Sequence, residues 1–78
     1  MSSRVDHLVK MANQIALNFG EKRDAALATR KTAEHLHKFW TRAMCEQLAA
    51  HVDAGGDDVS ATVQSALGEI SADREVQP

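Results

Sequence analysis

The sequence has 78 residues, a single cysteine and a formal net charge of −2, with acidic and basic residues interspersed. A chain of this length forms one small domain, and one cysteine cannot close an internal disulfide. Nucleic-acid-binding domains of this size are usually basic, and a membrane-spanning helix needs about 20 consecutive apolar residues, which no stretch here provides. Because the N-terminus also lacks the hydrophobic region of a secretory signal, we expect a cytoplasmic protein that binds neither nucleic acid nor membrane.

The first predicted element is a helix over residues 4–19. Ser3 followed by Asp6 is close to a capping box, and Gly20 is typical of the residue that ends a helix. Apolar residues recur within this segment at alternating steps of three and four, which places them on one helical face: Val5, Leu8, Ala12, Ile15 and Phe19.

A long helical segment follows, from a predicted N-cap at Asp24 to the glycine pair Gly55–Gly56. A single helix of this extent would be about 45 Å long, and the first helix is too short to cover it. Either the segment breaks near Trp40–Thr41, with Thr41 as a cap, or part of its apolar face is left for another protein. We favour a break with some surface still uncovered. The predicted apolar stripe of this segment comprises Ala26, Thr29, Ala33, Leu36, Trp40, Met44, Leu48 and Val52.

The last predicted element is a short helix over residues 60–67, capped by Asp58 or Ser60. Residues 68–78 are read as a polar tail that is disordered unless bound. The expected domain division is therefore a single helical domain over 1–67 and a C-terminal tail over 68–78. The expected fold class is all-α, a small bundle of three to four helices. Of the two alternatives for its long central segment, a break near Trp40–Thr41 is the favoured one.

Residues that could carry chemistry do not form a recognisable catalytic or metal site. His35 and His37 are two residues apart, so on a helix they point in nearly opposite directions and cannot hold one ion together. Cys45 is followed directly by Glu46 and has no Gly-rich oxyanion turn near it in sequence, so we interpret it as a small half-buried residue. We expect a chain that binds no metal or cofactor and is not an enzyme by itself.

The two adjacent aromatic residues are more informative. Phe39 and Trp40 diverge by about 100° around a helix, which places Trp40 in the main stripe and Phe39 at its edge or on another face. Both could be core residues, or one could anchor a partner, since aromatic residues and methionine are favoured at interface centres. Met11 has the same ambiguity, because it neighbours the first stripe without belonging to it.

Three stretches carry a further signal when taken together and in order: "HLVKMANQIALNF" at 7–19, "HLHKFWTRAMCEQLAAHVDAGG" at 35–56 and "VSATVQSAL" at 59–67. With them the chain resembles the delta subunit of soluble NAD-dependent formate dehydrogenases. Family members often carry Asp-Pro-Arg-Met after the tryptophan, where this chain has Thr41, Arg42, Ala43 and Met44. Without that proline a longer, bent helix also becomes possible. Any polar contact made by the family's arginine at the Ala43 position is in doubt.

The resemblance implies an accessory subunit that docks on the catalytic alpha subunit and supports its assembly or stability. In such enzymes the alpha subunit holds a molybdenum or tungsten bis-pterin cofactor and iron–sulfur clusters, and other subunits pass electrons through FMN to NAD. The delta subunit itself carries no cofactor. We expect it to contact its partner through Met11, Phe39, Trp40 and Met44, with Arg42 at the rim. The alternatives are a transient assembly or cofactor-insertion chaperone for that enzyme, and a self-associating helical regulator.

Overall fold

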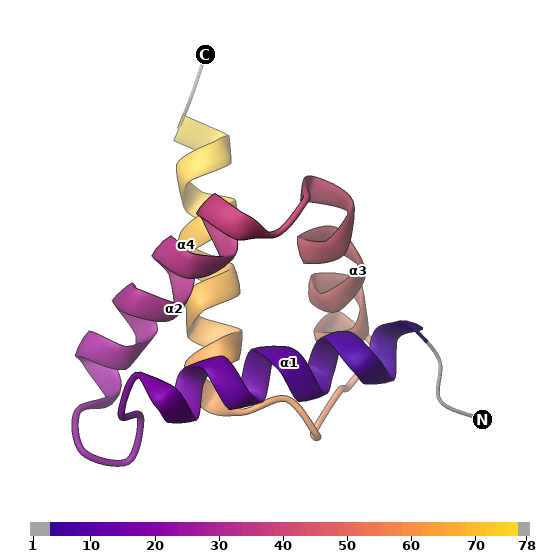
Figure 1. Cartoon of the computed structure of the whole chain (residues 1–78). Helices are drawn as coiled ribbons and strands as arrows, with labels where there is room; N and C mark the ends of the chain where they lie inside the picture. Colours follow the sequence, from indigo (N-terminus) through magenta and orange to yellow (C-terminus); the bar gives the residue numbers. More distant parts are fainter. Residues whose placement is uncertain (1–3, 77–78) are drawn as a thin grey trace.

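A computed structural model describes residues 4–76 of the chain, with side chains described up to residue 71 (Figure 1). The regular structure of this part is four helices: α1 (Arg4–Asn18), α2 (Ala25–Phe39), α3 (Arg42–Asp53) and α4 (Ala61–Val76). α1 contacts all three other helices, and α2 packs most extensively on α4. The predicted all-α bundle is confirmed. None of the described helices combines the length and hydrophobicity needed to cross a membrane.

α1 ends as its sequence indicates. Gly20 has a positive φ of 82°, a conformation that glycine adopts without steric cost. The N–H of Glu21 donates to Ala16 O (3.2 Å) and the N–H of Gly20 donates to Leu17 O (3.0 Å), which is the hydrogen-bond pattern of a Schellman motif. The predicted stop at Gly20 is therefore confirmed. The predicted cap at Ser3 lies outside the described residues.

The predicted apolar stripes differ in part from the buried faces. In α1, Val9 and Ala16 are buried, whereas Phe19 lies just past the helix and is 36% exposed. In α2, Ala28 and Thr32 are buried and Ala26 is exposed. The reason is tertiary: α1 touches three helices and α2 packs most extensively on α4, so neither buried face is the single narrow arc that the sequence periodicity describes.

The predicted break at Trp40–Thr41 is confirmed. α2 ends at Phe39, and Trp40 and Thr41 both have extended backbone, with ψ of 146° and 160°. The Thr41 Oγ1 accepts a hydrogen bond from the N–H of Met44 (3.2 Å), so it caps α3. The longer, bent helix that the missing proline made possible does not form. At its other end α3 stops at Asp53, directly before Ala54 and the predicted glycine pair.

The last helix is longer than predicted. Ser60 is the cap, since its Oγ accepts from the N–H of Val63 (3.3 Å). The expected helix end at residue 67 is wrong, because α4 continues to Val76 and includes residues assigned to the tail. Ile70, one turn beyond the expected end, is only 5% exposed and packs in the core. The apolar spacing of the helix continues past the expected boundary, and this burial stabilises the extra turns.

One hydrophobic core receives side chains from all four helices. Its central members are fully or almost fully buried: Leu8, Val9, Ala12, Ala16, Leu36, Trp40, Cys45, Leu48, Val59, Val63, Leu67 and Ile70. Met11, Ile15 and Met44 pack against this core but are only partly buried. These three residues therefore contact the core and are also accessible from the surface.

Replacing Thr41 with alanine should lower the free energy of unfolding by about 1 kcal/mol, because α3 loses the hydroxyl that satisfies the N–H of Met44. Chemical denaturation monitored by circular dichroism measures this difference. Thr41→Ser keeps the hydroxyl and should stay close to the original stability. Equal stability of Thr41→Ala and the unmodified chain would contradict the capping role.

Two glycines should respond in opposite directions to alanine. A Cβ at Gly56 would lie 2.7 Å from His51 Cδ2 and 2.9 Å from the His51 carbonyl oxygen, so Gly56→Ala should destabilise the chain by about 1–3 kcal/mol. Gly68 lies inside α4 with open space around its Cα, so Gly68→Ala should stabilise the chain by up to about 1 kcal/mol. Thermal unfolding of both variants provides the comparison. A stabilised Gly56→Ala would contradict the close approach of His51.

Candidate partner-binding groove

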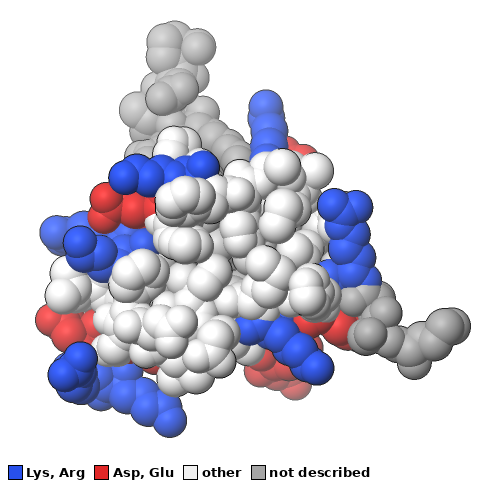
Figure 2. All heavy atoms as spheres, in the orientation of Figure 1, with Lys and Arg blue, Asp and Glu red and all other residues white. Residues whose placement is uncertain are grey.

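An open groove of about 660 Å³ lies between α1 and the junction of α2 with α3. Most of its lining is apolar, and its residues are Lys10, Met11, Gln14, Ile15, His35, Phe39, Trp40 and Met44. Figure 2 shows the face formed by α1, α2 and α3, with a broad uncharged area bordered by basic and acidic side chains. The groove is thus an apolar surface within a charged margin.

Helical spacing brings these side chains together. Met11 and Ile15 are four residues apart in α1, and His35 and Phe39 are four residues apart in α2, so each pair lies on one helical face. Trp40 follows α2, and Met44 lies in the first turn of α3. Because the chain changes direction at Trp40–Thr41, residues from three helices converge on one groove.

Phe39 and Trp40 have different environments. Trp40 is only 8% exposed and belongs to the core, although part of it lines the groove. Phe39 is 71% exposed, the most exposed of the large hydrophobic residues in the described part of the chain. The interpretation that both are core residues is therefore wrong. Of the two, Phe39 is the side chain that a second protein could bury in an interface.

Three rings form a row beside the groove. The His35 ring lies 4.8 Å from the Phe39 ring, tilted by 46°, and 6.1 Å from the Phe19 ring in an edge-on arrangement. These distances are typical of favourable aromatic contacts. His35 therefore supports the exposed Phe39 ring from one side and limits its orientations.

The structure brings together four of the five residues predicted to bind a partner. Met11, Phe39, Trp40 and Met44 line the groove, whereas Arg42 does not. The Arg42 guanidinium instead pairs with Glu46 on the same helix (Nε–Oε1 3.1 Å), and both side chains are largely exposed. Whether the five residues contact a partner stays a prediction.

The sequence analysis missed the groove residues Lys10, Gln14, Ile15 and His35 as contact candidates. Two of them could have been found, because Ile15 lies four residues after Met11 and His35 lies four before Phe39. Lys10 and Gln14 carry no such signal in the sequence. A smaller depression of about 230 Å³ shares His35 and Phe39 with the groove. It is also lined by Phe19, Lys31, Glu34 and Lys38.

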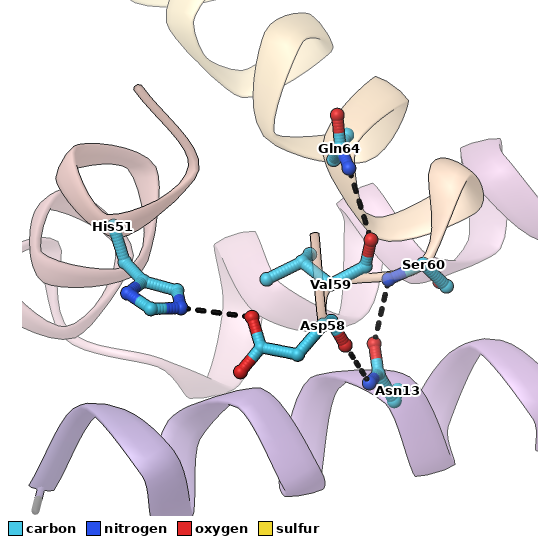
Figure 3. Close-up of polar contacts among 6 residues, drawn as sticks. All are labelled: Asn13, His51, Asp58, Val59, Ser60 and Gln64. Carbon is cyan, nitrogen blue, oxygen red and sulfur yellow. Dashed lines mark hydrogen bonds and ion pairs between the residues drawn. The ribbon is translucent and has the colours of Figure 1, made fainter. Parts of the chain in front are cut away.

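A polar cluster away from the groove fixes the loop between α3 and α4 (Figure 3). The Asn13 side chain of α1 donates to Asp58 O (2.8 Å) and accepts from the N–H of Ser60 (3.0 Å). Gln64 Nε2 donates to Val59 O (2.9 Å). These bonds satisfy backbone groups of the loop and tie it to α1, far away in the sequence.

His51 and Asp58 complete this cluster. His51 Nε2 lies 2.9 Å from Asp58 Oδ1, and this hydrogen bond lowers the pKa of Asp58 below its ordinary value of 3.8. An ionised carboxylate only accepts, so Nε2 is the nitrogen that carries the proton. The contact joins α3 to the loop before α4, which is a structural role for the pair. The Ser60 hydroxyl nearby caps α4, and Cys45 is buried. Within the described residues, no group of three or more His, Cys, Asp or Glu could hold a metal ion.

A family model described as "NADH-dependant formate dehydrogenase delta subunit FdsD" matches residues 7–67. The chain belongs to this family. The resemblance found in the sequence is thereby confirmed, and the protein is a small subunit of a formate dehydrogenase complex. No curated protein and no solved structure gave a significant match.

The FdsD match contains every residue that lines the groove and the whole Asn13–His51–Asp58 cluster. The matched segment ends at residue 67, inside α4, so the rest of that helix lies beyond it. The groove and the polar cluster of this delta subunit therefore lie within the segment that matches the family model.

Replacing Asp58 with asparagine should reduce the acid sensitivity of the fold. Since the pKa of Asp58 is lowered in the folded state, its carboxylate stabilises the protein above the ordinary pKa of 3.8. That contribution is lost as the pH falls through the lower, folded-state value. Unfolding free energies measured between about pH 5 and pH 2 should therefore fall less steeply for Asp58→Asn than for the unmodified chain.

Asp57→Asn is the matched control, because it removes a carboxylate from the same loop and leaves the contact between Asp58 and His51 in place. It should keep the part of the acid dependence that this contact produces. Identical pH profiles for Asp58→Asn and the unmodified chain would show that the contact is not formed in solution.

Proposed function

We propose that this delta subunit is a cytoplasmic, non-catalytic accessory subunit that docks on the catalytic alpha subunit of NAD-dependent formate dehydrogenase. In this proposal the cofactors reside in the partner subunits: molybdenum or tungsten bis-pterin, iron–sulfur clusters and FMN. The observation that carries the proposal is an apolar groove with a phenylalanine 71% exposed at its edge, in a chain that belongs to a family of enzyme subunits.

Phe39 is suited to the centre of an interface. Its ring is held on one side by His35 and on the other borders the groove, so a partner can bury it without reordering the backbone. Large aromatic residues often supply most of the binding energy at protein interfaces. Little conformational entropy is lost when an already oriented ring is buried, and this favours tight docking.

The mechanism we propose is stabilisation by mass action. A subunit that binds only the folded, cofactor-loaded catalytic subunit shifts that partner toward the bound state and away from unfolding. A partner concentration 100-fold above the dissociation constant corresponds to about 2.7 kcal/mol of stabilisation. Met11, Phe39, Trp40 and Met44 would form the contact surface, and Arg42 would lie outside the groove at its rim.

Replacing Phe39 with alanine should weaken binding to the catalytic subunit by about 2 kcal/mol or more, roughly 30-fold. Because the ring is mostly exposed, the unfolding free energy should change by no more than about 0.5 kcal/mol. Trp40→Ala should instead cost about 3–5 kcal/mol of folding stability, since the buried ring leaves a cavity. Leu27→Ala is the control, because Leu27 is 45% exposed on the same helix but lines neither the groove nor the smaller depression.

The experiment is to tag the chain, purify it from its own cells and identify the proteins that accompany it in stoichiometric amounts. Recovery of an active, NAD-reducing formate dehydrogenase with the unmodified chain and Leu27→Ala, but not with Phe39→Ala, supports the proposal. Recovery of only immature catalytic subunit identifies a transient chaperone instead. Recovery of the chain as a defined homo-oligomer identifies a self-associating regulator.

A further inference from the structure

We propose that the segment of the catalytic subunit that fills the groove is amphipathic and acidic. Its apolar side chains would cover Met11, Ile15 and Phe39, and its carboxylates would face the lysines at the groove's margin. This inference rests on the proposed docking function and adds the chemistry of the partner surface.

The charge around the groove differs in sign from that of the whole chain. Lys10 lines the groove, and Lys31, Lys38 and Glu34 line the smaller depression beside it. Three lysines against one glutamate give this surface a formal charge of +2, whereas the chain carries −2. We refer to Lys10, Lys31 and Lys38 as the rim lysines. Figure 2 shows both basic and acidic side chains around the uncharged area.

The rim lysines take no part in the ion pairs seen among the described side chains. These pairs, Arg42–Glu46 and His51–Asp58, use other basic groups. Asp6 and Asp58 line a separate depression together with Lys10, but neither lines the groove. The rim lysines are therefore available to carboxylates of another chain, and a basic partner segment would be repelled.

Most of the groove is lined by apolar side chains, and two of the three rim lysines line the smaller depression beside it. A partner therefore has to match an apolar surface and a cationic one next to each other. The floor of the groove consists largely of Met11, Ile15, Trp40 and Met44, so the matching surface must be apolar at its centre. Lys10 lies on α1, and Lys31 and Lys38 lie on α2, the helix that ends at the exposed Phe39. A partner segment with a central apolar face and flanking carboxylates satisfies both requirements at once.

A second copy of this chain does not fit the same surface. Most homodimers are two-fold symmetric, and a symmetric contact through the groove would bring the two sets of rim lysines close together. Glu34 is the one acidic residue that lines either depression and could offset them. Like charges placed opposite each other disfavour such a pairing, so the charge pattern favours a different, acidic partner.

Charge reversal at the rim tests this inference directly. Lys10→Glu and Lys38→Glu should each weaken binding to purified catalytic subunit by about three- to tenfold at low salt. The difference should shrink as salt is raised, because the screening length falls to about 8 Å at physiological ionic strength. Lys22→Glu is the control, since Lys22 is exposed in the connection between α1 and α2 and lines neither depression. It should bind like the unmodified chain.

The outcomes separate this inference from the proposed function. If Phe39→Ala loses binding while both rim variants bind as tightly as Lys22→Glu or more tightly, the acidic partner is disproved and the groove is retained. If Phe39→Ala also binds normally, the groove is not the docking site and both proposals fail. Weakening of all variants alike, including Lys22→Glu, would indicate general charge attraction and would also disprove a specific role of the rim.

A cross-linking experiment identifies the partner segment. Gln14 lines the groove and is exposed, and its side chain donates a hydrogen bond to Asn18 on the same helix (3.2 Å), so it can carry a photo-reactive amino acid without disturbing the core. In the full complex, the cross-linked peptide should belong to the catalytic subunit and carry Asp or Glu beside apolar residues. A peptide flanked by Lys or Arg, or one from a second copy of this chain, would overturn the inference.

Discussion

Two extended residues, Trp40 and Thr41, separate α2 from α3, and the rest of the structure depends on this change of direction. It places the Trp40 ring in the core while the preceding Phe39 ring stays at the surface. It also lets α3 pack against α1 and α4, where a continuous helix would carry these residues away from the core. The Thr41 hydroxyl satisfies one N–H of the first turn of α3, that of Met44, which offsets part of the cost of the break.

A second constraint places α4. The loop before it is held by the Asn13 side chain, which pairs with backbone groups of Asp58 and Ser60, and by the contact between His51 and Asp58 (Figure 3). A chain of 78 residues has a small core, so few apolar contacts can orient a whole helix. Directional hydrogen bonds at its N-terminus help to fix the orientation of α4. Burial of Ile70 extends the packing of this helix toward its other end.

The groove and the core are two parts of one packing arrangement. Three residues, Met11, Ile15 and Met44, pack against the core and also line the groove. The stability of the core and the shape of the groove therefore depend on the same side chains. A partner docked as proposed would bury apolar surface that this chain leaves partly exposed. Such burial would stabilise both chains through the same contact.

The sequence by itself determined the fold class, the end of α1 and the starts of the three later helices. The caps at Asp24 and Thr41 and the stop at Gly20 act within a few residues, so local chemistry is sufficient to locate them. Only the tertiary structure decided which face of α2 is buried, that α4 continues past residue 67, and that Phe39 rather than Trp40 is exposed. The groove likewise needs residues from α1, α2 and α3 at once. Periodicity marks which residues share a face, but the partner of that face is set by contacts between distant segments.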